Sequence, residues 1–260
     1  MTWFNDLTGI SNETLEAVHE LLSVKGTPRN LLAALQGVRH SWVMTSPAPP
    51  SAPWLAIPRP GAVIAVLMVL TCGLELIVAA ADIGLIGSAR WRPLVLQYGA
   101  CWPGLMRDWQ PNFAAQPWTM FLSYSLLHAG VLHLLGNMAV LLWIGPGLVA
   151  RIGQLEFLLL WVGSVLGGGI VFVVMASAPT PMVGASGAVF GLMGALVILD
   201  YVRTGKYGKA LFITLGLALL NIAMLIIEDG LLAWQTHLGG YIAGGMIAMM
   251  LRDRSQPDLT

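Results

Sequence analysis

The sequence predicts an all-α, polytopic membrane protein. Of its 260 residues, 57% are hydrophobic and only 10% are charged, and the mean hydropathy is +0.75. A soluble domain carries about 25% charged residues, so this chain has too few charges to cover a surface that faces water. Hydrocarbon must solvate most of it. Each spanning segment is then expected to be a helix, because a helix satisfies its own backbone hydrogen bonds.

Six apolar runs predict six transmembrane helices. A spanning helix needs about 20 residues, within a range of about 17–25. The runs cover residues 61–81, 131–150, 155–176, 186–202, 210–227 and 231–251. The fourth run is the shortest, so the sequence predicts a six-helix bundle with a short fourth helix.

The rest of the chain divides around this core. Residues 1–60 are expected to form a cytoplasmic helical region followed by a proline-rich linker, and residues 252–260 a cytoplasmic tail. Residues 1–20 lack the basic start and unbroken apolar stretch of a signal peptide. Insertion into the membrane is therefore expected to depend on the spans within residues 61–251.

The placement of lysine and arginine predicts the orientation. Segments that carry these residues are expected to face the cytoplasm. With both termini inside, the cytoplasmic segments hold Lys25, Arg29, Arg39, Arg59, Arg151, Arg203, Lys206, Lys209, Arg252 and Arg254, and the outer loops hold Arg90, Arg92 and Arg107. We therefore expect a multi-pass protein of the cell (inner) membrane with both termini in the cytoplasm.

The loop between the first two spans, about residues 82–130, is too long for a simple connection. It contains four tryptophans, a residue that favours the membrane interface: Trp91, Trp102, Trp109 and Trp118. This loop is expected to lie on or partly in the outer leaflet. A charged carboxylate such as Glu75, in the first span, is costly in hydrocarbon and must face protein or water. We expect its contact to be structural rather than catalytic.

Polar side chains in three separate spans are predicted to share one depth. A helix rises about 1.5 Å per residue, which places Asn137 and His237 both about 10 Å below the outer surface, with His133 one turn above Asn137. Ser186 begins the short fourth span and so also starts below that surface. Polar groups in spans are expensive, which makes each of them a functional candidate.

Glycines on the fourth and sixth spans would allow these two helices to approach closely. Small residues at helical spacing permit close contact between backbones. Pairing Gly187 and Gly191 with Gly240 and Gly244 is expected to bring the Ser186 hydroxyl near the His237 imidazole.

These residue types are the parts that acyl transfer requires. A serine hydroxyl needs an adjacent base, and histidine is the usual one. No aspartate or glutamate near this layer orients His237, so a dyad is favoured over a triad, and Phe190 is positioned to hold the imidazole by stacking. The start of the fourth helix offers unpaired backbone N–H groups to an oxyanion, and His133 and Asn137 share one helix face and can add donors.

At these residues the chain resembles the rhomboid family of intramembrane serine proteases, over roughly residues 61–251. The motifs that carry the resemblance are HAGVLHLLGN at 128–137, GASG at 184–187 and HLGG at 237–240. The resemblance implies Ser186 as nucleophile and His237 as general base. It also implies an oxyanion hole from the Ser186 backbone N–H, His133 and Asn137, and supporting roles for His128 and Gly184.

The resemblance implies transmembrane protein segments as substrates, cleaved near the outer face without metal or cofactor. The chain departs from the family pattern at three places. Trp118 is followed by Thr119 where arginine is usual, Val149 stands where glutamate is common, and Phe190 replaces a frequent tyrosine. Without arginine at position 119, the first loop lacks the residue that usually anchors it in the family.

Three other functions each account for part of this pattern. A catalytically inactive relative that binds membrane clients would typically lack the serine or the histidine, and this chain has both. A transporter pathway would continue polar residues toward the cytoplasm, which the spans below Asn137 and Phe190 do not do. Three histidines, His128, His133 and His237, can hold zinc, but the HExxH signature is absent.

Cys72 and Cys101 form no disulfide or zinc pattern, and the zero net charge gives no reason to expect nucleic acid as a partner.

Overall fold

The computed structural model describes residues 61–176, 180–227, 231–251 and 253. The predictions for residues 1–60 and for most of 252–260 lie outside the described residues, so the three-part division of the chain stays a prediction. The described part belongs to one compact unit, Pro58–Thr260.

The regular elements of the described residues are all helices, apart from one isolated antiparallel bridge between Cys101 and Met182. The six expected spans are the helices α4 Ala62–Asp82, α7 Val131–Ile152, α8 Gln154–Met175, α9 Ser186–Thr204, α10 Tyr207–Ile227 and α11 Trp234–Met250. The first five are long and apolar enough to cross a membrane. The all-α fold and the six-helix core are therefore confirmed.

The fourth helix is short, as the sequence predicts, but it is not the shortest of the six. The fourth helix, α9, has 19 residues, whereas the last, α11, has 17 and is the shortest of the six. The apolar pattern did not reveal the actual ends. α9 continues to a left-handed Gly205 that stops it, and α11 starts only at Trp234 although the apolar run begins earlier.

The side chains on the outside of the bundle suit a hydrocarbon solvent. Large apolar residues are exposed on helix after helix; Val69, Trp143, Phe212, Ile227 and Met250 are each more than 65% exposed. None of the residues of α10 is buried. A water-soluble protein rarely exposes so wide an apolar surface, so these faces are expected to contact lipid.

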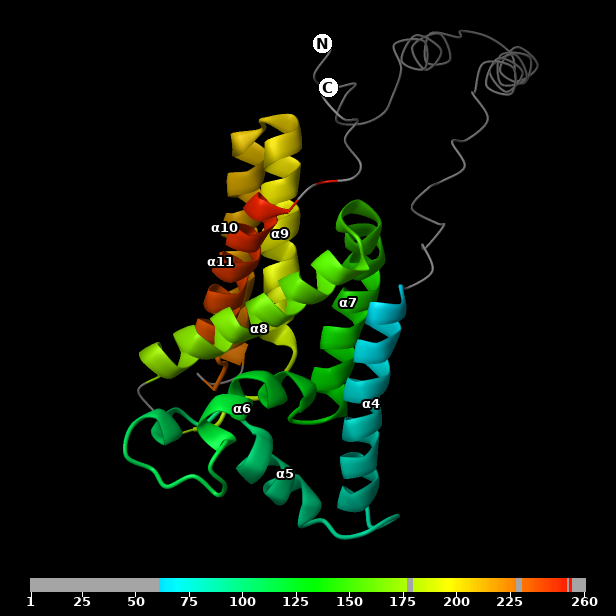
Figure 1. Cartoon of the computed structure of the whole chain (residues 1–260), viewed down its shortest axis with the longest axis vertical. Helices are drawn as coiled ribbons and strands as arrows, with labels where there is room; N and C mark the ends of the chain where they lie inside the picture. Colours follow the sequence, from blue (N-terminus) through cyan, green and yellow to red (C-terminus); the bar gives the residue numbers. More distant parts are fainter. Residues whose placement is uncertain (1–60, 177–179, 228–230, 252, 254–260) are drawn as a thin grey trace, which may run out of the picture. The chain divides into compact units, whose positions relative to one another are not determined.

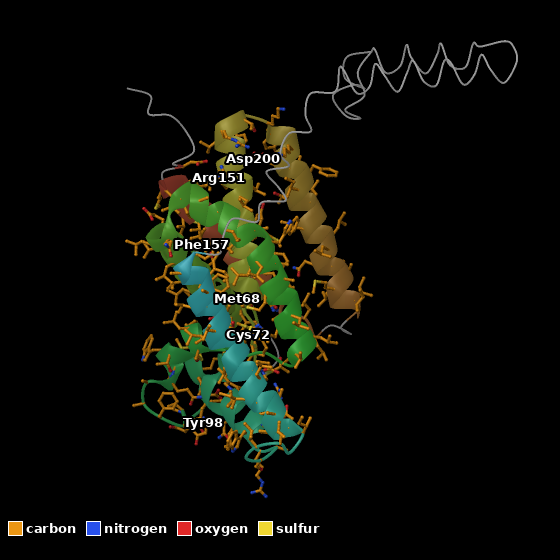
Figure 2. The ribbon with its side chains drawn as sticks, turned by 90° about the vertical axis from the view of Figure 1, so that its right-hand side faces the viewer. Met68, Cys72, Tyr98, Arg151, Phe157 and Asp200 are labelled. Carbon is orange, nitrogen blue, oxygen red and sulfur yellow. The ribbon has the colours of Figure 1, made fainter. Side chains whose placement is uncertain are left out.

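The long first loop gathers at one end of the bundle (Figure 1). It contains α5 Trp91–Gly99, η1 Pro103–Met106, α6 Gln116–Ser123 and η2 Tyr124–Leu126. Arg151 and Asp200 lie at the opposite end from Tyr98 of α5 (Figure 2). There Arg151 pairs with Asp253, and Asp200 pairs with Arg203 and Lys209.

The closest packing in the bundle joins α9 to α11, with α8 lying obliquely across the group (Figure 1). The predicted glycine contact is confirmed. A Cβ added to Gly240 would overlap the carbonyl group of Gly187, and one added to Gly244 would lie 2.5 Å from the carbonyl carbon of Gly191. The two helices meet backbone to backbone, and no larger residue fits at these positions.

The contact between α9 and α11 predicts a sharp difference between two glycine-to-alanine changes. Gly244→Ala should lower the free energy of unfolding by about 2 kcal/mol, because the new methyl group meets rigid backbone. Gly216→Ala, on α10, has open space around it and should be neutral or slightly stabilising. Thermal unfolding in detergent measures both variants, and equal midpoints would contradict the packing described above.

Candidate active site

Ser186 is the first residue of α9 and is partly exposed. The backbone leading to it is held in place from the first loop. The Gly184 N–H donates to the Tyr124 carbonyl at 2.9 Å, and Met182 exchanges backbone hydrogen bonds with Cys101. No side chain caps the helix start, so backbone N–H groups of the first turn remain available to an acceptor beside the serine.

His133 packs directly on the turn that precedes Ser186. A Cβ built on Gly184 would lie 2.7 Å from Cε1 and 2.8 Å from Nε2 of the His133 ring. Gly184 also has φ +123°, a conformation that other residues rarely adopt. Glycine is thus required at 184 both for the turn and for the space that the imidazole takes.

Asn137 lies one turn below His133 on α7 and is buried, with 6% of its surface exposed. Its Nδ2 donates to the His133 carbonyl at 2.9 Å. This bond uses one of the two N–H donors of the amide and fixes its orientation relative to His133.

His237 lies on α11 and stacks flat on Phe190 of α9. The ring centroids are 4.2 Å apart and the planes differ by 4°. Both side chains are buried. Phe190 is one turn after Ser186, so the stacking expected from the sequence is present and holds the imidazole beside the face of α9 that carries the serine.

The glycine contact sets the relative position of Ser186 and His237. Gly187, next to the serine, touches Gly240, which is one turn after His237. Within the described residues no hydrogen bond joins Ser186 to His237. Catalytic hydrogen bonds are often long without substrate and tighten in the complex, so the arrangement is compatible with a Ser-His pair.

Residues 114–254, more than half of the chain, match the Rhomboid domain. This chain belongs to the rhomboid family. As a member of that family it is a multi-pass membrane protein.

Several curated relatives carry the rhomboid name. The putative rhomboid protease YdcA of Bacillus subtilis is 28% identical over 152 residues, which cover 57% of this chain and 75% of YdcA. RHOMBOID-like protein 4 of Arabidopsis thaliana is 33% identical over 135 residues, 50% of this chain and 33% of the relative. Rhomboid protease GluP of Bacillus subtilis is 31% identical over 138 residues, 52% of this chain and 26% of GluP. The match thus spans a third or less of two of these three relatives.

His128 lies in the loop before α7 and contacts the turn that precedes Ser186. It is buried, and its ring meets the edge of His133 with centroids 5.2 Å apart. The Ala185 N–H points at its Nε2 from 3.5 Å. Burial, and then the nearby His133, lower the pKa of His128 to about 4, with the Leu126 carbonyl opposing part of the shift. His128 is therefore neutral at physiological pH and able to accept a hydrogen bond.

Asn221 was not predicted from the sequence. Its Oδ1 lies 2.7 Å from Nδ1 of His237. From the sequence, no acidic residue is expected to orient this imidazole, and residues 210–227 are expected to form an apolar span. An amide inside that span was the signal, because polar side chains in the membrane normally have a partner.

A largely apolar cavity of about 360 Å³ lies between α10 and α11, and its wall includes Asn221, Trp234 and His237. Across the described ranges, no group of three or more His, Cys, Asp or Glu side chains is arranged to hold a metal ion.

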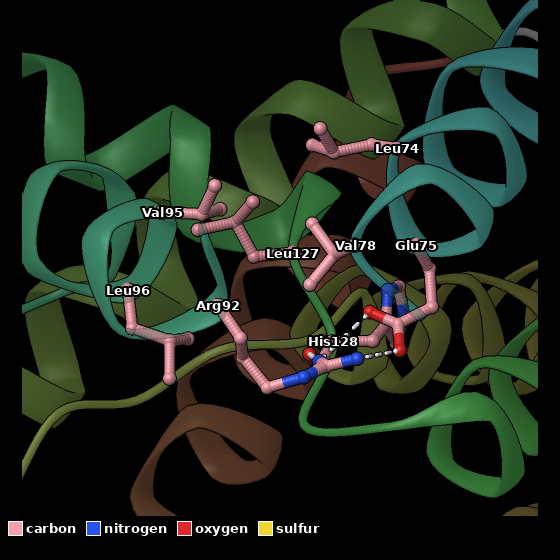
Figure 3. A pocket seen from close by; sticks show the side chains of 8 residues that line it. All are labelled: Leu74, Glu75, Val78, Arg92, Val95, Leu96, Leu127 and His128. Atoms are coloured by element: carbon pink, nitrogen blue, oxygen red, sulfur yellow. Dashed lines mark hydrogen bonds and ion pairs between the residues drawn. The ribbon is translucent and has the colours of Figure 1, made fainter. Parts of the chain in front are cut away.

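The first loop of this rhomboid is anchored by Arg92 of α5 (Figure 3). Its guanidinium bonds both oxygens of Glu75 at 2.8 and 3.2 Å, Asp82 at 2.6 Å and the His128 carbonyl at 3.1 Å. A second arginine, Arg107, donates to the Ala176 carbonyl at 2.8 Å. Glu75 has the structural partner that it was expected to need, and Arg92 was missed as the loop anchor.

Removing the anchor is predicted to destabilise the protein. Arg92→Gln leaves the Glu75 carboxylate, whose side chain is 2% exposed, without its partner, and should lower the free energy of unfolding by about 2–3 kcal/mol. Arg90→Gln, two residues earlier and exposed, is the matched control and should have little effect. The double variant Glu75→Gln/Arg92→Gln should recover part of the loss. Equal stability of the two single variants in thermal unfolding would contradict the anchoring role.

Proposed function

We propose that this rhomboid is an intramembrane serine endopeptidase with a Ser186–His237 dyad. The observation that carries the proposal is the backbone contact of α9 with α11, which sets the hydroxyl-bearing helix start beside an imidazole stacked on Phe190. The family includes proteins named rhomboid proteases, and this chain has both residues of the dyad.

The chemistry follows from the groups present. His237 takes the proton of the Ser186 hydroxyl as Oγ attacks the carbonyl carbon of the scissile peptide. The oxyanion that forms is stabilised by the Ser186 backbone N–H together with donors from His133 and Asn137. The imidazolium then gives its proton to the leaving amine, which leaves an acyl-enzyme. Water, deprotonated by the same imidazole, attacks the ester and releases the second product.

The proposed substrates are transmembrane segments of other proteins. We place the site near the outer face of the cell membrane, with both termini in the cytoplasm. The cluster of ionic side chains around Asp200, at the end opposite α5, supports this orientation, because it includes Arg203 and Lys209. A substrate helix reaches the dyad from the lipid and must unwind locally to present its backbone.

The proposal predicts complete dependence on Ser186. Ser186→Ala should abolish cleavage of a model transmembrane substrate in liposomes and covalent labelling by a fluorophosphonate probe, with the thermal midpoint retained. His237→Ala should be comparably inactive, because general base catalysis contributes about 10²–10⁴-fold. Ser88→Ala, in the first loop, is the control and should keep both activities.

The same assay separates the rival functions. Cleavage that persists in Ser186→Ala would remove this serine from the mechanism. Loss of activity in EDTA would favour a metal-dependent protease, whereas this proposal expects no effect of the chelator. A wild-type protein that binds membrane clients but neither cleaves them nor reacts with the probe would be the catalytically inactive relative.

A further inference from the structure

The contact between Asn221 and His237 assigns a role to a helix that otherwise adds little to the site. α10 has no buried residue and few contacts with its neighbours. Its apolar sequence is interrupted at Asn221, whose amide meets the imidazole on α11 at 2.7 Å. An amide in hydrocarbon is costly unless it is hydrogen-bonded, so this contact accounts for the presence of asparagine on a lipid-facing helix.

The atoms involved determine the state of the imidazole. The amide oxygen of Asn221 can only accept a hydrogen bond, so Nδ1 of His237 must carry the hydrogen. In a neutral imidazole the other nitrogen, Nε2, then has a free lone pair. That is the form in which a histidine can take a proton from a serine.

Two restraints together fix the ring. Stacking on Phe190 sets its plane, and the hydrogen bond from Nδ1 sets its rotation within that plane. We propose that Asn221 is the positioning residue for His237, holding its tautomer and directing Nε2 toward the Ser186 side of α11. This inference rests on the proposed function. Asn221 acts through the imidazole and does not contact the substrate.

The alternative is that Asn221 only joins α10 to α11. The structure provides a matched control for that possibility. Thr214 Oγ1 and the Tyr241 hydroxyl form a second hydrogen bond between the same two helices at 2.6 Å. Thr214→Val removes this bond without touching His237, so a purely structural role for Asn221 predicts similar effects from both losses.

The test compares Asn221→Leu, Asn221→Asp and Thr214→Val in the full chain, reconstituted in liposomes with a model transmembrane substrate. Asn221→Leu should lower kcat about tenfold, roughly the worth of one lost hydrogen bond, with KM changed less than about twofold. The rate of fluorophosphonate labelling should fall in parallel. Asn221→Asp retains an acceptor for Nδ1–H and should restore most of the activity, while Thr214→Val should keep the wild-type kcat.

Equal kcat values for Asn221→Leu and Thr214→Val would overturn the inference, and so would an Asn221→Asp variant as slow as Asn221→Leu. A second measurement does not depend on activity. In ¹⁵N-histidine solid-state NMR of the wild type, the His237 signal, assigned by its loss in His237→Ala, should be that of the Nδ1-protonated tautomer. A hydrogen on Nε2 alone would overturn the inference. An Nδ1 hydrogen in a protein that never labels would leave the positioning intact and remove the proposed function instead.

Discussion

The arrangement of this protein depends on the contact between the backbones of α9 and α11. Gly187 and Gly191 meet Gly240 and Gly244 with no side chain between them. In lipid there is little hydrophobic gain from bringing two helices together, so close van der Waals packing of this kind is a main source of their association. Because the helices are rigid, the register of the glycines also sets the register of every residue above them, including Ser186 and His237.

The membrane explains the second feature, which is the pairing of Glu75, Asn137 and His237 with polar partners inside the bundle. Glu75 meets Arg92, Asn137 bonds the backbone of its own helix, and the imidazole of His237 has the amide of Asn221. Each of these groups would be expensive in hydrocarbon alone. The same pairs connect the first loop to α4 and α10 to α11, so the partners that make the polar groups tolerable also position the candidate site.

The sequence predicted the parts of this structure that depend on local pattern. Apolar runs gave the six helices. The glycine spacing correctly predicted which faces of α9 and α11 meet. The sequence did not predict Asn221 or Arg92, because their roles depend on which helices become neighbours across the bundle. The short fourth helix was predicted, but the later start of α11 at Trp234 was not, because hydropathy does not show where a helix starts after an apolar loop.

The most direct measurement is an experimental structure of the protein in a lipid environment, which gives the distance between Ser186 Oγ and His237 Nε2. The account predicts about 3 Å, or a single bridging water, as a nucleophile and its base require. A serine and an imidazole separated by more than one water, or directed into lipid on different sides of the α9–α11 contact, would contradict it.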